Sequence, residues 1–162
     1  MQLTCTCEDM ASAASLDLKM SYYVFNRSPN IRMVYIQHCS ELYVRLDFRG
    51  VDSTNFPVYF RSLQKLHIED IIFEPTYNRR QELQLNFYNV QEILMRNLMV
   101  QDTFKMHAEN VKEARISNST FNHIPTKGMI ISQANLLDIQ DSKFYRVYRQ
   151  SIIIEKTKKV RK

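Results

Sequence analysis

A short motif that recurs about every twenty residues constrains the fold of this 162-residue chain more than any other feature. It is read in VQEILMRN from Val90, VKEARISN from Val111 and ANLLDIQD from Ala134. Apolar residues stand at the first, fourth and sixth places, and Asn or Asp stands at the eighth. Self-similarity at such a period is typical of solenoids, in which each repeat forms one coil stacked on the previous coil.

A second, alternating segment precedes the motif in each repeat. Alternation of apolar and polar residues is typical of a half-buried strand, so we expect an A strand here and a B strand in the motif itself. The predicted inward residues of the A strands are Leu83, Leu85 and Phe87; Phe104, Met106 and Ala108; Met129 and Ile131; and Ile152 and Ile154. Asn89, Asn110 and Gln133 are predicted at the corner before B, and Asn97, Asn118 and Asp141 at the corner after it. Val100, Phe121 and Phe144 are predicted to point inward on a third side, followed by Thr103, Ile124 and Val147.

The outward residues provide an independent test of the stacking. Equivalent positions on neighbouring parallel coils lie about 4.8 Å apart, so opposite charges at such positions would attract each other. Five such pairs are predicted: Asp17 and Arg45, Lys19 and Asp47, Lys65 and Glu92, Glu69 and Arg96, and Arg115 and Asp138. Glu92 beside Glu113 is the exception. In the less regular N-terminal part, IRMVYIQH from Ile31 is assigned to a B strand, with Tyr35 in the outward column of His67, and Pro57 is placed in a connection.

The coils resemble the rungs of right-handed parallel β-helix proteins, in which an apolar strand runs into an Asn corner, as in ISNSTF from Ile116. This resemblance implies an all-β solenoid, a right-handed parallel β-helix of about six coils over residues 16–155. Residues 1–15 are then an N-terminal lead-in or cap, and residues 156–162 are a basic tail and the start of an incomplete coil. A leucine-rich-repeat horseshoe is the alternative, because Cys5-Thr6-Cys7 resembles the cysteine-bearing cap of its extracellular members. The Asn at the eighth place and the alternating return side favour the β-helix.

Charge and hydropathy limit the classes of partner. The formal charge is +5, and five basic residues after Glu155 account for all of it, so the rest of the chain is neutral. No nucleic-acid partner is therefore expected for the body, although the tail leaves nucleic-acid or glycosaminoglycan binding open as an alternative. No segment has the roughly 18 apolar residues of a membrane span. The polar residues after Met1 do not resemble a signal peptide.

The cysteines and two glycosylation sequons bear on the compartment. Cys5, Cys7 and Cys39 are odd in number, so their disulfide pairing stays open, and they are too few for a metal site. Asn118 and Asn26 each begin an Asn-x-Ser/Thr sequon, the latter weakened by the following Pro29. For Asn118 a ladder with the corner residues Asn97 and Asp141 is the favoured explanation. We expect an extracellular or cell-surface protein, with a cytoplasmic location as the alternative.

No enzymatic chemistry is evident. Carbohydrate-cleaving β-helices carry clustered carboxylates on adjacent coils, because glycosidic cleavage needs an acid and a base flanking the bond. No such column is found here, and the four histidines fall on different sides of the coil. The two glycines also give no phosphate-binding loop, so neither catalysis nor a cofactor is expected.

Tyrosine and arginine, which dominate interface hot spots, are concentrated on the third side. The predicted partner-binding residues are Tyr77, Arg79, Arg80, Tyr145, Arg146, Tyr148 and Arg149, together with the outward pair Ile130 and Ile153. We therefore expect a recognition or adhesion scaffold that binds a protein partner. The alternative is a fragment of a carbohydrate-active β-helix enzyme or a glycan-binding module. Thr157 and Val160 begin a further B strand, so a fragment, a shortened isoform or edge-to-edge self-association is also expected.

Overall fold

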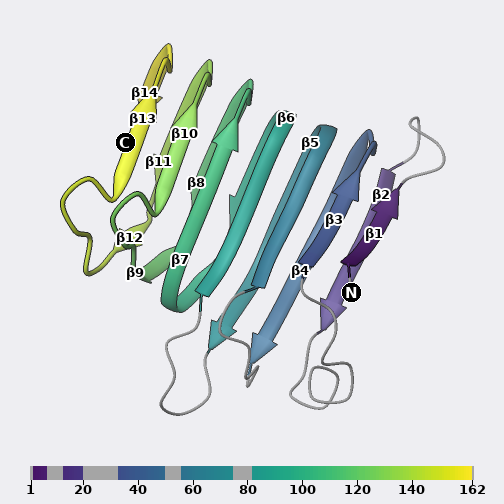
Figure 1. The fold of residues 1–162 in the computed structure, drawn as a ribbon, viewed down its shortest axis with the longest axis horizontal. Coiled ribbons are helices and arrows are strands. Elements are labelled where there is room, and N and C mark those ends of the chain that lie inside the picture. The colour runs from purple at the N-terminus through teal and green to yellow at the C-terminus, as the bar shows by residue number, and fades with distance from the viewer. Residues whose placement is uncertain (1, 7–12, 20–32, 50–55, 75–81, 162) are drawn as a thin grey trace.

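The chain forms a parallel β-solenoid of about five turns (Figure 1), close to the predicted six. This computed structural model describes residues 2–6, 13–19, 33–49, 56–74 and 82–161, and these contain strands and no helix. The strands are β1 (Gln2–Thr6), β2 (Ala13–Lys19), β3 (Met33–Gln37), β4 (Glu41–Arg49), β5 (Phe56–Glu74), β6 (Glu82–Arg96), β7 (Met99–Glu109), β8 (Glu113–Ser117), β9 (Thr120–His123), β10 (Met129–Ser132), β11 (Leu136–Gln140), β12 (Lys143–Phe144), β13 (Ile152–Glu155) and β14 (Lys159–Arg161).

Three stacks of parallel strands make up the sides of the coil. Sheet A contains β1, β3, the first part of β5, the first part of β6, the second part of β7, β10 and β13. Sheet B contains β2, β4, the middle of β5, the second part of β6, β8, β11 and β14. Sheet C is shorter and contains the ends of β4 and β5, the start of β7, β9 and β12. Figure 1 shows the strands in chain order from the purple N-terminal end to the yellow C-terminal end.

The core is a column of apolar side chains inside the coils. Every predicted inward residue of the A strands from Leu83 to Ile131 is buried, and the predicted registers are confirmed, as in Leu85 beside Met106 and Ile131 beside Ile154. Phenylalanine rings stack from coil to coil, with Phe121 lying 4.6 Å from Phe104 and 5.1 Å from Phe144 between ring centroids. Phe121 and Phe144 occupy equivalent places on sheet C, whereas Phe104 reaches Phe121 from sheet A, so rings of two sides join in one continuous core.

The corners are formed by residues in the left-handed backbone conformation. The six predicted corner residues all have φ between 48° and 57°, which Asn and Asp tolerate better than other side chains. At the corner after sheet B, Asn118 Nδ2 donates to Asn97 Oδ1 at 2.7 Å, and Asn97 Nδ2 donates to Asp70 Oδ1 at 3.1 Å. The predicted ladder is therefore confirmed between Asn97 and Asn118, and it continues to Asp70 through side-chain hydrogen bonds.

Serines that follow the second corner continue this bonding. Ser119 Oγ accepts the Leu98 N–H at 3.2 Å, and Ser142 Oγ accepts the Ser119 N–H at the same distance. Each hydroxyl also donates to a carbonyl of its own coil, Ser117 or Gln140. The hydroxyls therefore satisfy backbone N–H groups that the ladder cannot reach at the bend.

The five predicted charge pairs all lie in register, and so does the like-charged exception, Glu92 beside Glu113. Residues of opposite charge that lie in register form an ion pair in some of these cases and not in others. Arg96 Nη1 lies 4.0 Å from Glu69 Oε1, as predicted, but Arg115 pairs with Glu113 of its own strand at 2.9 Å. Asp138, the expected partner of Arg115, instead accepts hydrogen bonds from Gln140 Nε2.

Several sequence-based assignments are wrong, among them the places of Tyr35, Pro57 and Val147. Pro57 lies in β5 and not in a connection. Tyr35 belongs to sheet A, where β3 pairs with the segment from Val58 to Arg61, and Tyr43 occupies its expected place beside His67. Val147 is 44% exposed although its backbone bridges to Ile124. Left-handed residues at Arg146 and Gln150 turn the chain there, so the segment does not continue as an inward-facing strand.

The two ends of the predicted solenoid also carry paired strands. β1 pairs in parallel with β3, so described strand pairing begins at Gln2, within the expected lead-in. β14 pairs with β11, placing Val160 beside Leu137, as expected for the start of a further B strand.

Candidate binding surfaces

The predicted partner residues near the C-terminus lie together on the outer side of sheet C. Tyr145 and Tyr148 are 50% and 55% exposed, and Arg146 and Arg149 are exposed as well. Tyr145 and Arg146 line a shallow hollow of about 410 Å³ with Gln101 and Asn122, which lie on earlier coils. Met99, which is 48% exposed, lies beside Gln101. We call the following set of residues the C-terminal patch: Met99, Gln101, Asn122, Tyr145, Arg146, Tyr148 and Arg149.

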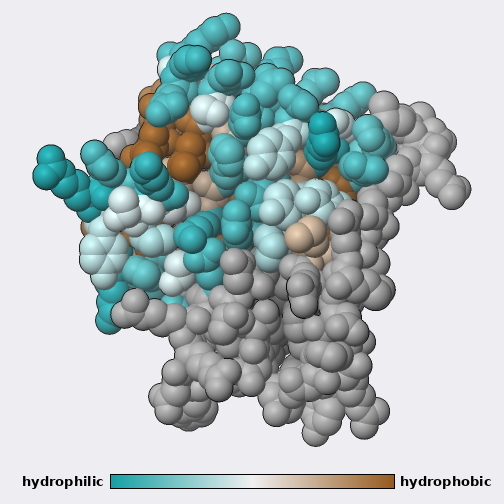
Figure 2. All heavy atoms as spheres, viewed as in Figure 1, coloured by the Kyte–Doolittle hydropathy of each residue, from teal (hydrophilic) through white to brown (hydrophobic). Residues whose placement is uncertain are grey.

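The other predicted partner-binding residues do not belong to the C-terminal patch. Ile130 and Ile153 stack in register on the outer side of sheet A and are half-buried, away from the C-terminal patch. Figure 2 shows an apolar area among hydrophilic side chains over the strands at the C-terminal end of the stack. Tyr77, Arg79, Arg80 and the sequon residue Asn26 lie outside the described residues.

The other sequon residue, Asn118, is exposed at its corner. Its side-chain nitrogen, the atom that would carry a glycan, donates to Asn97 in the ladder. One N–H of the amide is used by this bond, and the residue stays a predicted glycosylation site.

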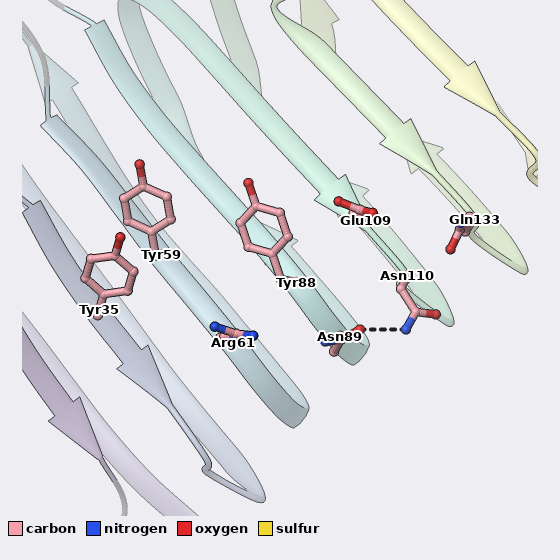
Figure 3. A pocket seen from close by; sticks show the side chains of 8 residues that line it. All are labelled: Tyr35, Tyr59, Arg61, Tyr88, Asn89, Glu109, Asn110 and Gln133. Carbon is pink, nitrogen blue, oxygen red and sulfur yellow. Dashed lines mark hydrogen bonds between the residues drawn. The ribbon is translucent and has the colours of Figure 1, made fainter.

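A groove of about 480 Å³ crosses the outer side of sheet A and was not predicted from the sequence. Its lining comes from five strands or the corners that follow them: β3, β5, β6, β7 and β10. Figure 3 shows Tyr35 and Tyr59 side by side on neighbouring coils, in the register of the strands, with the ring of Tyr88 beyond them. Tyr88 is in register with Arg61 and Glu109, and the corner residues Asn89, Asn110 and Gln133 complete the lining. Neighbouring coils lie about 4.8 Å apart, so four coil spacings give the groove a length of about 19 Å.

The tyrosines of this groove are held by contacts between coils. The rings of Tyr35 and Tyr59 are stacked, with centroids 4.5 Å apart and planes 8° from parallel. The Tyr88 hydroxyl lies 3.2 Å from His107 Nδ1 on the next coil, with the two rings edge to face. Beside these tyrosines, the buried Asn86 amide donates to the Val58 carbonyl and accepts from Gln84.

Burial in the groove raises the pKa of two of its tyrosines, Tyr59 and Tyr88. Burial, and secondarily the neighbouring Tyr35, raises the pKa of Tyr59 above 10.0. Burial also raises the pKa of Tyr88, with smaller contributions from Tyr59, Glu109 and Tyr35. At neutral pH these side chains carry an O–H group that can donate and accept.

A third cluster lies on the outer side of sheet B. His67 Nε2 lies 3.1 Å from Glu41 Oε1, and the Tyr43 hydroxyl donates to the same oxygen at 3.1 Å. The Tyr43 and His67 rings stack with centroids 4.3 Å apart. The three side chains are partners of one another, and the cluster joins two coils.

The described residues provide no grouping of three or more His, Cys, Asp or Glu side chains suited to a metal ion. No helix among them could cross a membrane. Cys39, whose pairing the sequence left open, is buried and disulfide-bonded.

The groove was not predicted because the regular C-terminal repeats include Tyr88 but do not extend to Tyr35 and Tyr59. The segment PVYF from Pro57 alternates, with Val58 and Phe60 buried and Tyr59 outward, which is the available signal for an A strand. The sequence-based prediction put Pro57 in a connection, so Tyr59 was not predicted on sheet A. It also assigned Tyr35 to a B strand, so the two tyrosines were not predicted to be neighbours.

Comparisons with protein-family models, curated proteins and solved structures gave no match for this chain. The class of protein is therefore defined by its strand pairing alone. That class is the parallel β-solenoid, with a tyrosine-lined groove on one side and a Tyr/Arg patch on another.

Proposed function

We propose that this chain is a non-catalytic recognition scaffold, acting outside the cell or at its surface, that binds a protein partner through the C-terminal patch. We further propose that it belongs with the right-handed parallel β-helix repeat proteins. The observation that carries the function is the joint exposure of Tyr145 and Tyr148, each by half or more, beside two arginines. Tyr and Arg are enriched in the buried centres of protein interfaces, and a monomer gains nothing from exposing them together.

The rigid backing of the patch supports this role. Tyr145 N–H donates to the Phe121 carbonyl at 2.8 Å, and Phe144 packs against the core immediately before it. Tyr148 lies edge to face with His123, at 5.5 Å between ring centroids, and His123 Nδ1 is 2.8 Å from Thr103 Oγ1. Side chains held by a scaffold lose less entropy on binding, which strengthens association.

Two features support a location outside the cytosol. Cys39 is disulfide-bonded, and disulfides persist mainly in oxidising compartments. Asn118, the first residue of a sequon, is exposed at a corner where an attached glycan would project into solvent.

The carboxylate content of the groove on sheet A supports a binding role rather than glycoside cleavage. Among its lining residues only Glu109 is a carboxylate. Hydrolysis of a glycosidic bond ordinarily uses two carboxyl groups on opposite sides of that bond.

The test is a binding screen with the full chain against an array of receptor ectodomains, followed by affinity measurement of any partner. We expect the double substitution Tyr145→Ser/Tyr148→Ser to weaken binding at least about tenfold, because it removes about 1.4 kcal/mol or more of interface energy. Tyr43→Ser is the matched control, since Tyr43 is an exposed tyrosine on sheet B. A partner that binds the double variant as tightly as the native chain would contradict the proposal.

A further inference from the structure

The groove on sheet A combines aromatic surface with amide groups. Tyr35, Tyr59 and Tyr88 give it one wall, and Asn89 and Asn110 lie along the other (Figure 3). All three tyrosines are half-buried, so part of each ring faces solvent across the groove. Aromatic faces carry partial negative charge and attract the partly positive C–H groups of a ligand.

The amide wall can bind hydroxyl groups. Asn110 Nδ2 donates to Asn89 Oδ1 at 2.6 Å, which uses one N–H of Asn110 and fixes both side chains. Primary amides carry two N–H donors and a carbonyl acceptor, so the second N–H of Asn110 and the N–H groups of Asn89 are available to a ligand. Gln133 adds another amide on the next coil, also at a left-handed corner.

The charges in the groove oppose a highly charged ligand. Arg61 and Glu109 are the only charged residues of its lining, and they are of opposite sign. A nucleic acid or a sulfated glycan would require an excess of cations, as in other sites that bind polyanions. An acyl chain would require an apolar lining, whereas most of these residues are polar.

We propose that this groove binds a neutral, unbranched oligosaccharide. Such a ligand has C–H faces for the tyrosines and hydroxyl groups for the amides, and it carries no charge to be balanced. The groove, about 19 Å long by its four coil spacings, suits several consecutive sugar units rather than a monosaccharide. The site lies on sheet A and shares no residue with the C-terminal patch, so it is independent of the proposed protein partner.

The neutral phenols agree with this assignment. Tyrosine hydroxyls are protonated at neutral pH, so those of Tyr59 and Tyr88 add donors along the aromatic wall. Burial raises the pKa of both still further from neutrality. Tyr88 is also held by His107, which limits the loss of side-chain entropy on binding.

The first test is calorimetric titration of the full chain with three kinds of probe. Cellotetraose and chitotetraose represent linear neutral polysaccharides, a released high-mannose glycan represents protein-linked sugars, and a heparin tetrasaccharide represents acidic ones. We expect a neutral tetrasaccharide to bind more tightly than the other two probes. Tighter binding of the heparin tetrasaccharide, exclusive binding of the branched glycan, or no binding of either neutral tetrasaccharide at about 1 mM would overturn the proposal.

Substitutions locate the site. Tyr59→Ala should weaken binding at least about tenfold, whereas Tyr59→Phe, which keeps the stacking ring, should weaken it by no more than about threefold. Tyr43→Ala is the matched control, because Tyr43 is an exposed tyrosine on sheet B outside both proposed binding surfaces, and it should leave the affinity unchanged. Equal affinity of the native chain and Tyr59→Ala would contradict the proposal.

A measurement on the native chain avoids any dependence on the folding of the variants. With tyrosine rings labelled with ¹³C, bound tetrasaccharide should shift the ring signals of Tyr35, Tyr59 and Tyr88. The signals of Tyr145 and Tyr148 should not move. Shifts confined to the latter two would place the sugar on the C-terminal patch and overturn the assignment.

Discussion

Asn118 and Asn97, one coil apart in the stack, are joined by a hydrogen bond of 2.7 Å from Nδ2 to Oδ1. Both residues have a left-handed backbone, with φ of 48° and 56°. The same side chain therefore serves two purposes, since asparagine tolerates this conformation and links its coil to the next. The corners of the solenoid are held by side chains as well as by the parallel sheets.

The first prediction separates these two contributions at Asn97. Asn97→Gly should lower the free energy of unfolding by about 1 kcal/mol, because glycine accepts positive φ but loses the ladder bonds. Asn97→Ala should lower it by about 2 kcal/mol, since it loses the bonds and strains the backbone as well. Urea unfolding measures both values. Equal stability of Asn97→Ala and the native chain would show that neither contribution operates.

The second prediction concerns the stacked phenylalanines. Phe121 is fully buried between Phe104 and Phe144, so Phe121→Ala leaves a cavity within the column. We expect a loss of about 3–5 kcal/mol in urea unfolding, and a smaller loss for Phe121→Leu, which retains most of the volume. Exposed Met99→Ala is the control and should change stability by less than about 0.5 kcal/mol. A similarly small effect of Phe121→Ala would contradict the described core.

The third prediction concerns alkaline pH. The pKa values of Tyr59 and Tyr88 are raised in the folded chain by burial, so the folded state holds these protons more tightly than the unfolded state. The resulting stability is fully present below pH 10 and is lost as pH rises through the folded pKa values. Thermal unfolding between pH 9 and 11 should show this decline, and Tyr59→Phe/Tyr88→Phe should reduce its slope. An identical slope in the double variant would refute the assignment to these phenols.

The fourth prediction concerns the cysteines. Because Cys39 is disulfide-bonded and the chain has three cysteines, the oxidised protein should contain one free thiol. Mass spectrometry after alkylation should therefore find one modified cysteine before reduction and three after it. Reduction should also lower stability by about 2–4 kcal/mol, the usual contribution of a native disulfide. Three modified cysteines without reduction would show that the disulfide does not form.

The C-terminal coils could be predicted from the sequence because the strand alternation and the corner residues recur there at the same spacing. Leu83, Phe104 and Met106 alternate as strand residues, and Asn97 and Asn118 recur at the turns. In the structure Leu83 pairs with Phe104 and Leu85 pairs with Met106, as predicted, and Asn97 and Asn118 form left-handed corners. Side chains at equal places of near-equal coils must stack, so the spacing alone determines which residues become neighbours.

The N-terminal coils could not be predicted in the same way, because their connections differ in length. A strand with two buried positions, such as Val34 and Ile36, fits either sheet when the neighbouring coil is irregular. Pairing with Val58 and Phe60 decides between the sheets, and this pairing cannot be read from local spacing. The tyrosine groove depends on this choice, so it appeared only when the strands were placed in space.

The C-terminal patch could be predicted from the sequence only in part. The exposure of Tyr145 and Tyr148 was predicted from inward positions of Phe144 and Val147, and only Phe144 packs against the core. The exposure of Val147 was not predicted, because the left-handed turns at Arg146 and Gln150 interrupt the alternation. Since Val147 projects outward, it adds apolar surface beside the tyrosines that we propose contact a protein partner.

The central claim is that parallel coils bring Tyr35 of β3 and Tyr59 of β5 together, ring on ring, at one end of a ligand groove. Its most direct test is a nuclear Overhauser measurement on a sample in which these two tyrosine rings are assigned. With ring centroids 4.5 Å apart, we predict strong cross-peaks between the two rings, accompanied by the backbone contacts of parallel strands between Tyr35 and Tyr59. Antiparallel contacts between these strands, or ring signals without mutual cross-peaks, would contradict both the solenoid register and the groove.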